Sequence, residues 1–352
     1  MDFSKKLSLW YEKNKRSFPW RDSKNPYNIW LSEIILQQTQ TKQGLPYYIT
    51  FTKAFPTVQD LANAKEENVL KLWQGLGYYS RARNLHYAAK YICKELNGVF
   101  PKNYKELIQL KGVGDYTASA IASIAFNEKC AVVDGNVYRV LSRYFDIETA
   151  INSGKGTKEF KQLATQLLPK TDFGTYNQAL MDFGALICTP KKTGCDSCVL
   201  NDSCLALQKN KVHLLPVKTS KIKIKKRYFN YLVVISKNKE TIIKKRTGKG
   251  IWQNLYEFPL IETDTELTIT ELESNLDFLT FFNDSTINKT ELFNDSVIIH
   301  KLSHQHLHTN FWLISIDEIN QKSIPFTSLD KFPVPTLIHN FILQFHKSIK
   351  IN

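Results

Sequence analysis

The hydrophobic pattern of this 352-residue chain changes once, and that change constrains the fold more than any other feature. Through residue 208, apolar side chains recur at three- and four-residue spacing between Gly and Pro punctuation, which is typical of helices. From residue 228 onward the apolar runs are β-branched, aromatic and often alternating, which indicates strands. The sequence therefore predicts an all-α region over 1–208 followed by an α/β domain over 228–352, without an internal repeat.

Helices are expected wherever the three- and four-residue spacing persists. The predicted helices cover 2–16, 27–43, 57–63, 66–73, 80–96, 103–110, 115–126, 134–144, 157–168 and 175–187.

A basic segment, KNKVHLLPVKTSKIKIKKR at 209–227, separates the two regions. It contains eight basic residues, no acidic one, and Pro216. Like-charge repulsion and the proline favour an extended linker between domains. Such a linker either neutralises phosphates or is simply solvated, and the charge run alone does not distinguish the two.

The formal net charge of +14 indicates a polyanionic partner, nucleic acid before others, with solubility alone as the alternative. Residues 1–208 hold 27 basic and 19 acidic side chains, whereas 228–352 hold 12 and 14. A hydrophobic content of 43% excludes wholesale disorder. No run reaches the roughly 18 apolar residues of a membrane helix, and the N-terminus lacks a signal-peptide core. We expect a soluble, cytoplasmic monomer without a membrane partner, at the nucleoid if the source is bacterial.

Four of the six cysteines fall within 17 residues, at Cys188, Cys195, Cys198 and Cys204. In a reducing compartment, clustered thiols are more often metal ligands than disulfides. Four thiolates from one loop suit zinc or an iron–sulfur cluster, although zinc sites usually pair two C-x2-C units and only one is present. Four unrelated cysteines remain the third alternative.

The segment LKGVGDYTASAIASIA, residues 110–125, places a Gly-Val-Gly turn before a helix rich in small residues. Gly112 and Gly114 allow a tight turn and a close approach of the backbone to a ligand. The N–H groups of the next helix can hold a phosphate. This pattern is a helix–hairpin–helix that grips the DNA backbone, or else an ordinary interhelical turn.

Two carboxylates stand in unusual settings. Glu33 lies within an apolar helix, where it is either solvent-facing or buried with a raised pKa that suits a general acid. Asp134 opens a candidate helix in VVDGNVYRV, where it caps the helix, faces a cationic centre, or does both.

Three aromatic or amide-rich segments suit contact with bases. Residues 18–21, FPWR, join a flat aromatic to a guanidinium, which suits a flipped base. Residues 75–83, GLGYYSRAR, combine a flexible turn with aromatic wedges and the basic Arg81 and Arg83. The amides of QQTQ at 37–40 can pair with base edges.

Together, LSEIILQQTQ, GLGYYSRARNL, LKGVGDYTASAIA, VVDGNVYRV and the four-cysteine loop resemble the endonuclease III-like helix–hairpin–helix DNA glycosylases, and more narrowly the MutY-type adenine DNA glycosylases. That family removes adenine mispaired with guanine or 8-oxoguanine. The resemblance implies a six-helix hairpin module near 22–130, and a cluster module formed by the N-terminal helix with about 131–208. The C-terminal domain is then a Nudix-like one that recognises 8-oxoguanine.

The resemblance also implies a mechanism. Glu33 protonates the flipped adenine, and ionised Asp134 stabilises the oxocarbenium-like sugar. Tyr116 and Asn136 orient these carboxylates. Bifunctional relatives carry a lysine nucleophile where this chain has Tyr116, so the resemblance implies a monofunctional glycosylase. Lys111 precedes the hairpin and leaves weak lyase activity open.

Binding residues follow from matching positions. The adenine pocket matches Trp20, Arg21, Leu36 and Gln178, with Arg16 close by. The wedge beside the opposite 8-oxoguanine matches Gln38 and Tyr78, supported by Thr39 and Leu76. The lesion-probing loop of the last domain matches Leu302, Ser303 and His304, with Leu302 where Phe is common. Contacts to the DNA backbone fall to Gly112, Gly114, Arg81, Arg83, Lys191 and Lys192.

The cysteine loop matches the family's [4Fe–4S] loop, with Cys188, Cys195, Cys198 and Cys204 as ligands. The segment from Lys249 to Pro259 matches the Nudix-related turn, but no R-E-x-x-E-E helix follows it, so nucleotide hydrolysis is not expected. Four histidines in 300–308 allow a metal site by strand alternation, and the lesion-probing loop is the alternative. A glycosylase–lyase for oxidised pyrimidines and a non-catalytic damage-binding protein are the rival functions.

Overall fold

The computed structural model describes residues 2–219 and 224–348, which form two compact units. One unit joins the residues through Asn63 to those from Asn84 through Thr219. The other joins Ala64–Arg83 to the residues from Ile224 onward. The grouping of Ala64–Arg83 with the C-terminal residues was not expected, and the domain boundaries at 208 and 228 stay a prediction. In the described part of the chain, no helix is both long and apolar enough to cross a membrane.

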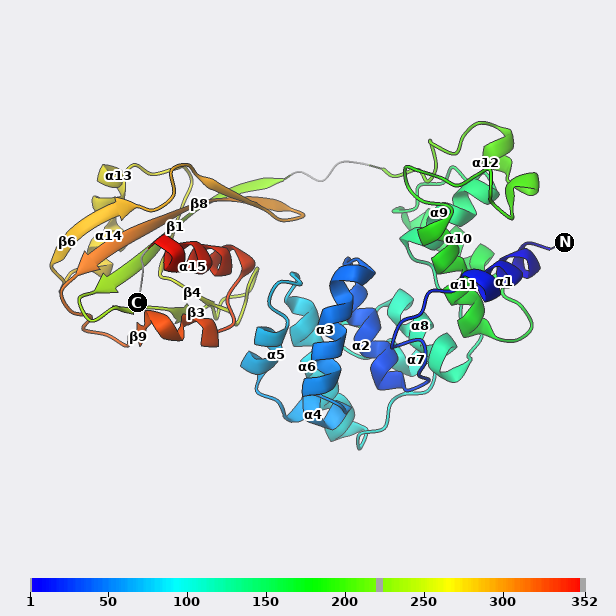
Figure 1. Ribbon diagram of the computed structural model, residues 1–352, viewed down its shortest axis with the longest axis horizontal. Helices are drawn as coiled ribbons and strands as arrows, with labels where there is room; N and C mark the ends of the chain where they lie inside the picture. Colours follow the sequence, from blue (N-terminus) through cyan, green and yellow to red (C-terminus); the bar gives the residue numbers. More distant parts are fainter. Residues whose placement is uncertain (1, 220–223, 349–352) are drawn as a thin grey trace. The chain divides into compact units, whose positions relative to one another are not determined.

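The first 208 residues are helical, as predicted, and contain no strand in the described part (Figure 1). The elements are α1 (Phe3–Asn14), α2 (Pro26–Leu36), α3 (Thr41–Ala54), α4 (Val58–Asn63), α5 (Glu66–Leu72), α6 (Ser80–Glu95), α7 (Tyr104–Leu107), α8 (Asp115–Phe126), α9 (Gly135–Tyr144), α10 (Gly154–Gln166), α11 (Phe173–Leu186), η1 (Asn201–Ser203) and α12 (Leu205–Gln208).

Helices α2 and α8 form the buried centre of the hairpin module. Eight of the eleven residues of α2 are buried, because apolar side chains cover most of its circumference. Helix α8 packs against it, and its small residues Ala118, Ala120 and Ala122 are fully buried. Small side chains let helix backbones approach closely, and this holds the hairpin beside Glu33.

Helix α1 completes a second core, although it is the first helix of the chain. Phe3, Leu7 and Trp10 are buried against residues of α9, α10 and α11. The ring of Trp10 meets that of Phe183 edge-on at 5.0 Å between centroids. The coil after α1 therefore begins beside α11 and leads into α2.

The helix predicted over 27–43 is wrong at residues 37–40, which divide it into two helices. Helix α2 ends at Leu36, Gln38 adopts a left-handed φ of +56°, and α3 starts at Thr41. Helix α3 was not predicted, because Gly44 and Pro46 disfavour a helix by local propensity. Its Tyr48 and Phe51 are buried, so tertiary packing outweighs that preference.

The connector between the regions, residues 209–219, was predicted to be extended, but it packs against the helical region. The Ile151 N–H donates to the Val217 carbonyl at 3.0 Å, and Asn152 hydrogen-bonds to Thr219. The Arg143 guanidinium donates to the Leu215 carbonyl at 3.0 Å, and Leu215 is buried. These long-range partners outweigh the charge repulsion on which the prediction rested. Residues 220–223 of the predicted linker lie outside the described residues.

The C-terminal region is a mixed α/β domain, as predicted. Its elements are β1 (Lys225–Ser236), β2 (Glu240–Thr241), β3 (Lys244–Lys245), β4 (Tyr256–Glu257), β5 (Leu260–Thr263), α13 (Ile269–Glu273), α14 (Leu276–Phe281), β6 (Ile287–Leu292), β7 (Ile298–Lys301), β8 (Gln305–Ile316), β9 (Ile324–Pro325), η2 (Phe326–Lys331) and α15 (Thr336–Ser348). The main sheet has the order β5-β1-β8-β6, and β7 also pairs with β8.

Both faces of the central strands are covered. Strands β1 and β8 are parallel, with Leu232 opposite Trp312, and both side chains pack with α13 and α14. Alternate residues face the other way, where Phe311 stacks on Phe341 of α15 at 4.1 Å. Burial on both faces explains the apolar runs in these strands.

Candidate active site

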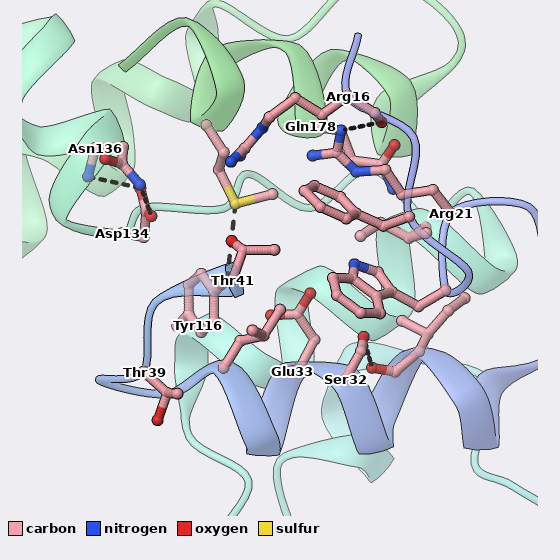
Figure 2. A pocket seen from close by; sticks show the side chains of 16 residues that line it. Arg16, Arg21, Ser32, Glu33, Thr39, Thr41, Tyr116, Asp134, Asn136 and Gln178 are labelled. Atoms are coloured by element: carbon pink, nitrogen blue, oxygen red, sulfur yellow. Dashed lines mark hydrogen bonds between the residues drawn. The ribbon is translucent and has the colours of Figure 1, made fainter. Parts of the chain in front are cut away.

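A cavity of about 170 Å³ opens between α2, α8, α11, the start of α9 and the coil after α1 (Figure 2). It brings together all four residues predicted to be catalytic and all five predicted for the adenine pocket. The lining residues are Arg16, Phe18, Trp20, Arg21, Ile29, Ser32, Glu33, Leu36, Thr39, Thr41, Tyr116, Ile124, Asp134, Asn136, Gln178 and Met181.

Glu33 projects from α2 into this cavity and is 8% exposed (Figure 2). Burial raises the pKa of its carboxyl to about 7, and the nearby negative charge of Asp134 adds to the rise. The nearby Tyr116 hydroxyl and the charge of Arg21 oppose it. At neutral pH Glu33 is therefore protonated in a large fraction of molecules, as a general acid requires. The solvent-facing alternative is excluded.

Asp134 both caps α9 and lines the cavity. Its carboxylate accepts hydrogen bonds from the backbone N–H groups of Asn136 and Val137 at 2.9 and 2.8 Å, and from the Asn136 amide at 2.7 Å. The pKa of Asp134 is raised, because burial outweighs the opposing effects of these donors and of the charge of Arg139. Three donors and a cation favour the ionised form, so the cap itself prepares this group for contact with a cation.

Each carboxyl has its own supporting side chain. Tyr116, the second residue of α8, lies beside Glu33, and burial next to that group keeps the pKa of the phenol well above its usual value; its hydroxyl donates to the Met181 sulfur at 3.7 Å. Asn136 bonds to Asp134, and its carbonyl accepts from Arg139 at 2.8 Å. The Arg139 guanidinium also donates to the Cys188 carbonyl at 2.6 Å, which joins this side of the cavity to the cysteine loop.

The coil between α1 and α2 forms one wall of the cavity, and the sequence predicted only some of its residues. The Trp20 ring stacks on Phe18 at 4.9 Å and 10°, so Phe18 extends the flat surface. Gln178 accepts a hydrogen bond from the Tyr11 hydroxyl at 3.1 Å. Two further lining residues could have been predicted from their positions in the sequence. Ser32 is adjacent to Glu33, and Met181 lies one helical turn after Gln178. Nothing local indicated Ile29, Thr41 or Ile124.

The two hairpin glycines differ in what they require. Gly112 has a φ of +83°, and a Cβ there would lie 2.7 Å from the Asn84 Cβ, so only glycine fits. Gly114 has an ordinary φ of −95°, and a Cβ there would meet nothing within 4 Å. The open space before α8 is where a phosphate can approach the helix N-terminus.

The predicted backbone-contact cations lie in two settings. Arg81 turns back to donate to the Leu76 and Gly77 carbonyls, and burial lowers its pKa to about 10. Arg83 donates to the Gln253 carbonyl at 2.9 Å. Lys191 and Lys192, on the cysteine loop, are exposed.

The residues predicted to meet the opposite lesion are also placed by the structure. Tyr78 and Ser303 belong to the same compact unit, and their hydroxyls hydrogen-bond to each other. Tyr78 is 47% exposed, as an aromatic wedge must be, and His304 is exposed. Leu76 is buried beneath this turn and Gln38 is exposed, whereas Thr39 lines the cavity around Glu33.

All four clustered cysteines line one small cavity, and none forms a disulfide. Burial raises the pKa of Cys198 to about 11, and the charges of the other three thiols add to the rise. Across residues 2–219 and 224–348, no three His, Cys, Asp or Glu side chains are grouped as a single metal ion requires. Four sulfurs around one cavity fit a metal centre that is held by thiolates. The histidines of 300–308 are not grouped as metal ligands either.

Comparison with known proteins covers both halves of the chain. Residues 31–170 match the HhH-GPD superfamily of base excision DNA repair proteins, and residues 230–344 match the NUDIX domain. An adenine DNA glycosylase of Buchnera aphidicola subsp. Baizongia pistaciae is 36% identical over 328 residues, which cover 92% of this chain and 90% of that protein. The human adenine DNA glycosylase is 43% identical over 216 residues, covering 59% of this chain and 40% of that protein.

Solved structures agree on the helical fold. A thermostable thymine-DNA glycosylase has a TM-score of 0.55 at 31% identity, over 59% of this chain and 95% of that one. An endonuclease III trapped on DNA has a TM-score of 0.52 at 21% identity, over 59% and 94%, a likeness of fold alone. Since the similarity to the Buchnera protein spans nearly all of both chains and both matched domains, this chain belongs to the adenine DNA glycosylases, base excision repair enzymes that hydrolyse an N-glycosidic bond.

Proposed function

We propose that this enzyme excises adenine mispaired with 8-oxoguanine or guanine in duplex DNA, and that it does so without lyase chemistry. The observation that carries the proposal is the pairing of two carboxyls of unlike environment on one cavity, Glu33 with a pKa of about 7 and Asp134 held by three N–H donors. Pairs of this kind divide proton donation from charge stabilisation.

The reaction begins when the target adenine leaves the base stack and enters the cavity. Trp20 and Phe18 offer their stacked rings, while Arg16, Arg21 and Gln178 offer polar contacts to the base edge. Leu36 closes the cavity on the side of α2. Glu33 then protonates a ring nitrogen, which makes adenine a better leaving group.

Cleavage of the N-glycosidic bond leaves an oxocarbenium-like sugar. The ionised Asp134 stabilises that cation, and Asn136 keeps its carboxylate oriented. Glu33, now ionised, accepts a proton from the incoming water by microscopic reversibility. Tyr116 orients Glu33 and has no amine with which to form a Schiff base. Lys111 does not line the cavity, and its amine lies 4.3 Å from the centre of the Tyr87 ring.

The cysteine loop would hold a [4Fe–4S] cluster through Cys188, Cys195, Cys198 and Cys204. When bound, the cluster ties the loop into one shape, so that Lys191 and Lys192 face a DNA phosphate. The opposite base is met by Gln38, Thr39, Leu76 and Tyr78 and by Ser303 and His304 of the Nudix-like domain. The hydrogen bond between Tyr78 and Ser303 supports a shared role for these two hydroxyls.

Single-turnover excision from a duplex with adenine opposite 8-oxoguanine tests the proposal, with wild type compared to Glu33→Gln. The variant keeps the shape of the side chain but has no proton to give, so excision should fall at least 100-fold while duplex binding persists. Equal excision by both proteins would overturn the role of Glu33. An efficient borohydride-trapped adduct would show a lyase, and no adenine release by the wild type would overturn the function.

A further inference from the structure

Asp182 has no part in the chemistry described so far, yet it lies directly behind the adenine cavity. It follows Gln178 by four residues on α11, so both side chains lie on the same face of that helix. Its side chain is 0% exposed and does not line the cavity itself. A fully buried carboxylate requires partners, and its partners are two of the cavity's own residues.

The Asp182 carboxylate holds two guanidinium groups at once. Arg21 donates to both of its oxygens at 2.6 and 2.8 Å, and Arg16 donates through Nε at 2.9 Å. Arg21 also donates to the Arg16 backbone carbonyl at 2.9 Å. Both arginines lie on the coil between α1 and α2, which has no regular structure of its own. Asp182 therefore fastens that coil to α11 as it passes the cavity.

The charge of this group matters as much as its shape. The two arginines hold the pKa of Asp182 below its usual value despite burial, so the carboxylate stays ionised. Two cations and one anion leave a single positive charge on this wall. The charged or titratable side chains that line the cavity are Arg16 and Arg21 on the coil, Glu33 on α2, Tyr116 on α8 and Asp134 at the start of α9. Arg21 is the cation that acts on Glu33.

We propose that Asp182 is a positioning residue for adenine excision: its buried carboxylate fixes Arg16 and Arg21 as one wall of the base pocket and cancels one of their two charges near Glu33. The inference rests on the proposed role of Glu33 as the general acid. Without Asp182, the wall carries two positive charges. An added cation favours the ionised form of Glu33, so this group loses its proton at a lower pH.

The test is the pH dependence of single-turnover excision by Asp182→Asn, on the duplex with adenine opposite 8-oxoguanine. In the wild type the rate should fall as the pH rises through about 7, because Glu33 deprotonates there. In Asp182→Asn this fall should move to lower pH by about one unit, in addition to a lower rate at every pH. A fall that stays at the wild-type pH overturns the proposal, whatever happens to the rate.

Two further variants separate charge from loss of structure. Asp182→Asn with Arg16→Gln restores a single net charge, so the midpoint should return toward that of the wild type while the rate stays low. If Asp182→Asn does not fold, Arg16→Gln alone should move the midpoint to higher pH, and an unmoved midpoint overturns the proposal.

Asp146→Asn is the matched control. Asp146 also pairs with two cations, Lys209 and Lys211, and its side chain is 7% exposed, but it lies outside the cavity. Its variant should keep the wild-type pH profile, and the same shift there would overturn the proposal by showing a general effect of lost ion pairs. Absence of excision by the wild type would instead contradict the proposed function, and with it this inference.

Discussion

Glu33 shows how a helix can store a reactive group at the expense of stability. Its burial among the apolar residues of α2 raises the pKa of the folded state to about 7, whereas an unfolded glutamate ionises near 4.5. Above pH 4.5 the unfolded chain gains from ionisation and the folded chain resists it, so stability falls as the pH rises toward 7. Below pH 4.5 both states bind the proton and the penalty disappears.

Glu33→Gln should therefore stabilise the protein while abolishing its activity. We expect a gain on the order of 3 kcal/mol at pH 8, from the difference between the two pKa values, and almost none at pH 4. Denaturant unfolding of both proteins at the two pH values measures it. Glu106→Gln on the exposed side of α7 is the control and should change little. Equal gains at pH 4 and pH 8 would show that the effect does not come from ionisation.

At the scale of elements, the hairpin between α7 and α8 contains two glycines with different roles. Gly112 is required for the fold, and Gly114 leaves space for a phosphate. Gly112→Ala adds a Cβ at a φ of +83° and 2.7 Å from Asn84, so it should lower the thermal midpoint clearly. Gly114→Ala adds a methyl group in open space at an allowed φ, so the fold should tolerate it. The methyl group instead obstructs a phosphate, so binding should weaken on every duplex regardless of its bases. Thermal unfolding and duplex titration of the two variants check the division; a large loss of stability in Gly114→Ala would contradict it.

The sequence predicted most of these elements and missed those that depend on distant partners. Periodicity found α2, α8, α9 and α11, because an apolar stripe is a local property. It extended α2 too far, since nothing in QQTQ shows that Gln38 takes a left-handed φ. The prediction of an unpacked connector was also wrong, because the Arg143–Leu215 hydrogen bond joins residues 72 positions apart and has no local signal in the sequence.

The candidate site divides in the same way. Glu33, Asp134 and the cysteines stand out because their residue types are unusual for their surroundings. Asp182 does not, because an aspartate four residues from Gln178 reads as an ordinary polar position on a helix. Its burial becomes visible only in the folded structure, where Arg16 and Arg21, more than 150 residues earlier in the chain, bind its carboxylate.

At the scale of the whole molecule, the charge of +14 is not all available to DNA. In the basic segment 209–227, Lys209 and Lys211 pair with Asp146 and Glu148, and Arg227 pairs with Glu262. The remaining described cations of that segment are Lys218, Lys225 and Lys226. The residues from 228 onward are net acidic and cannot hold DNA by bulk charge.

Replacing Lys218, Lys225 and Lys226 with Gln should therefore weaken binding to all duplexes and reduce the salt slope of log K by up to about 3. Replacing Lys209 and Lys211 should change the slope less per charge, because these lysines already have protein partners. Salt titrations on damaged and undamaged duplexes provide the comparison. Equal loss per lysine in the two sets would show that the internal ion pairs do not compete with phosphate.

The packing of α1 against α11 has a consequence for how the enzyme is made. Phe3, Leu7 and Trp10 leave the ribosome first, but their partners on α11 are translated more than 150 residues later. Until then the apolar surface that covers α1 is incomplete, and the coil that carries Trp20 and Arg21 lacks Asp182, its ion-pair partner on α11. The nascent chain can fold its hairpin module early, yet it cannot possess an adenine pocket. Catalytic competence is thus delayed until synthesis has passed α11, because a shorter chain lacks Gln178 and Met181, which line the cavity.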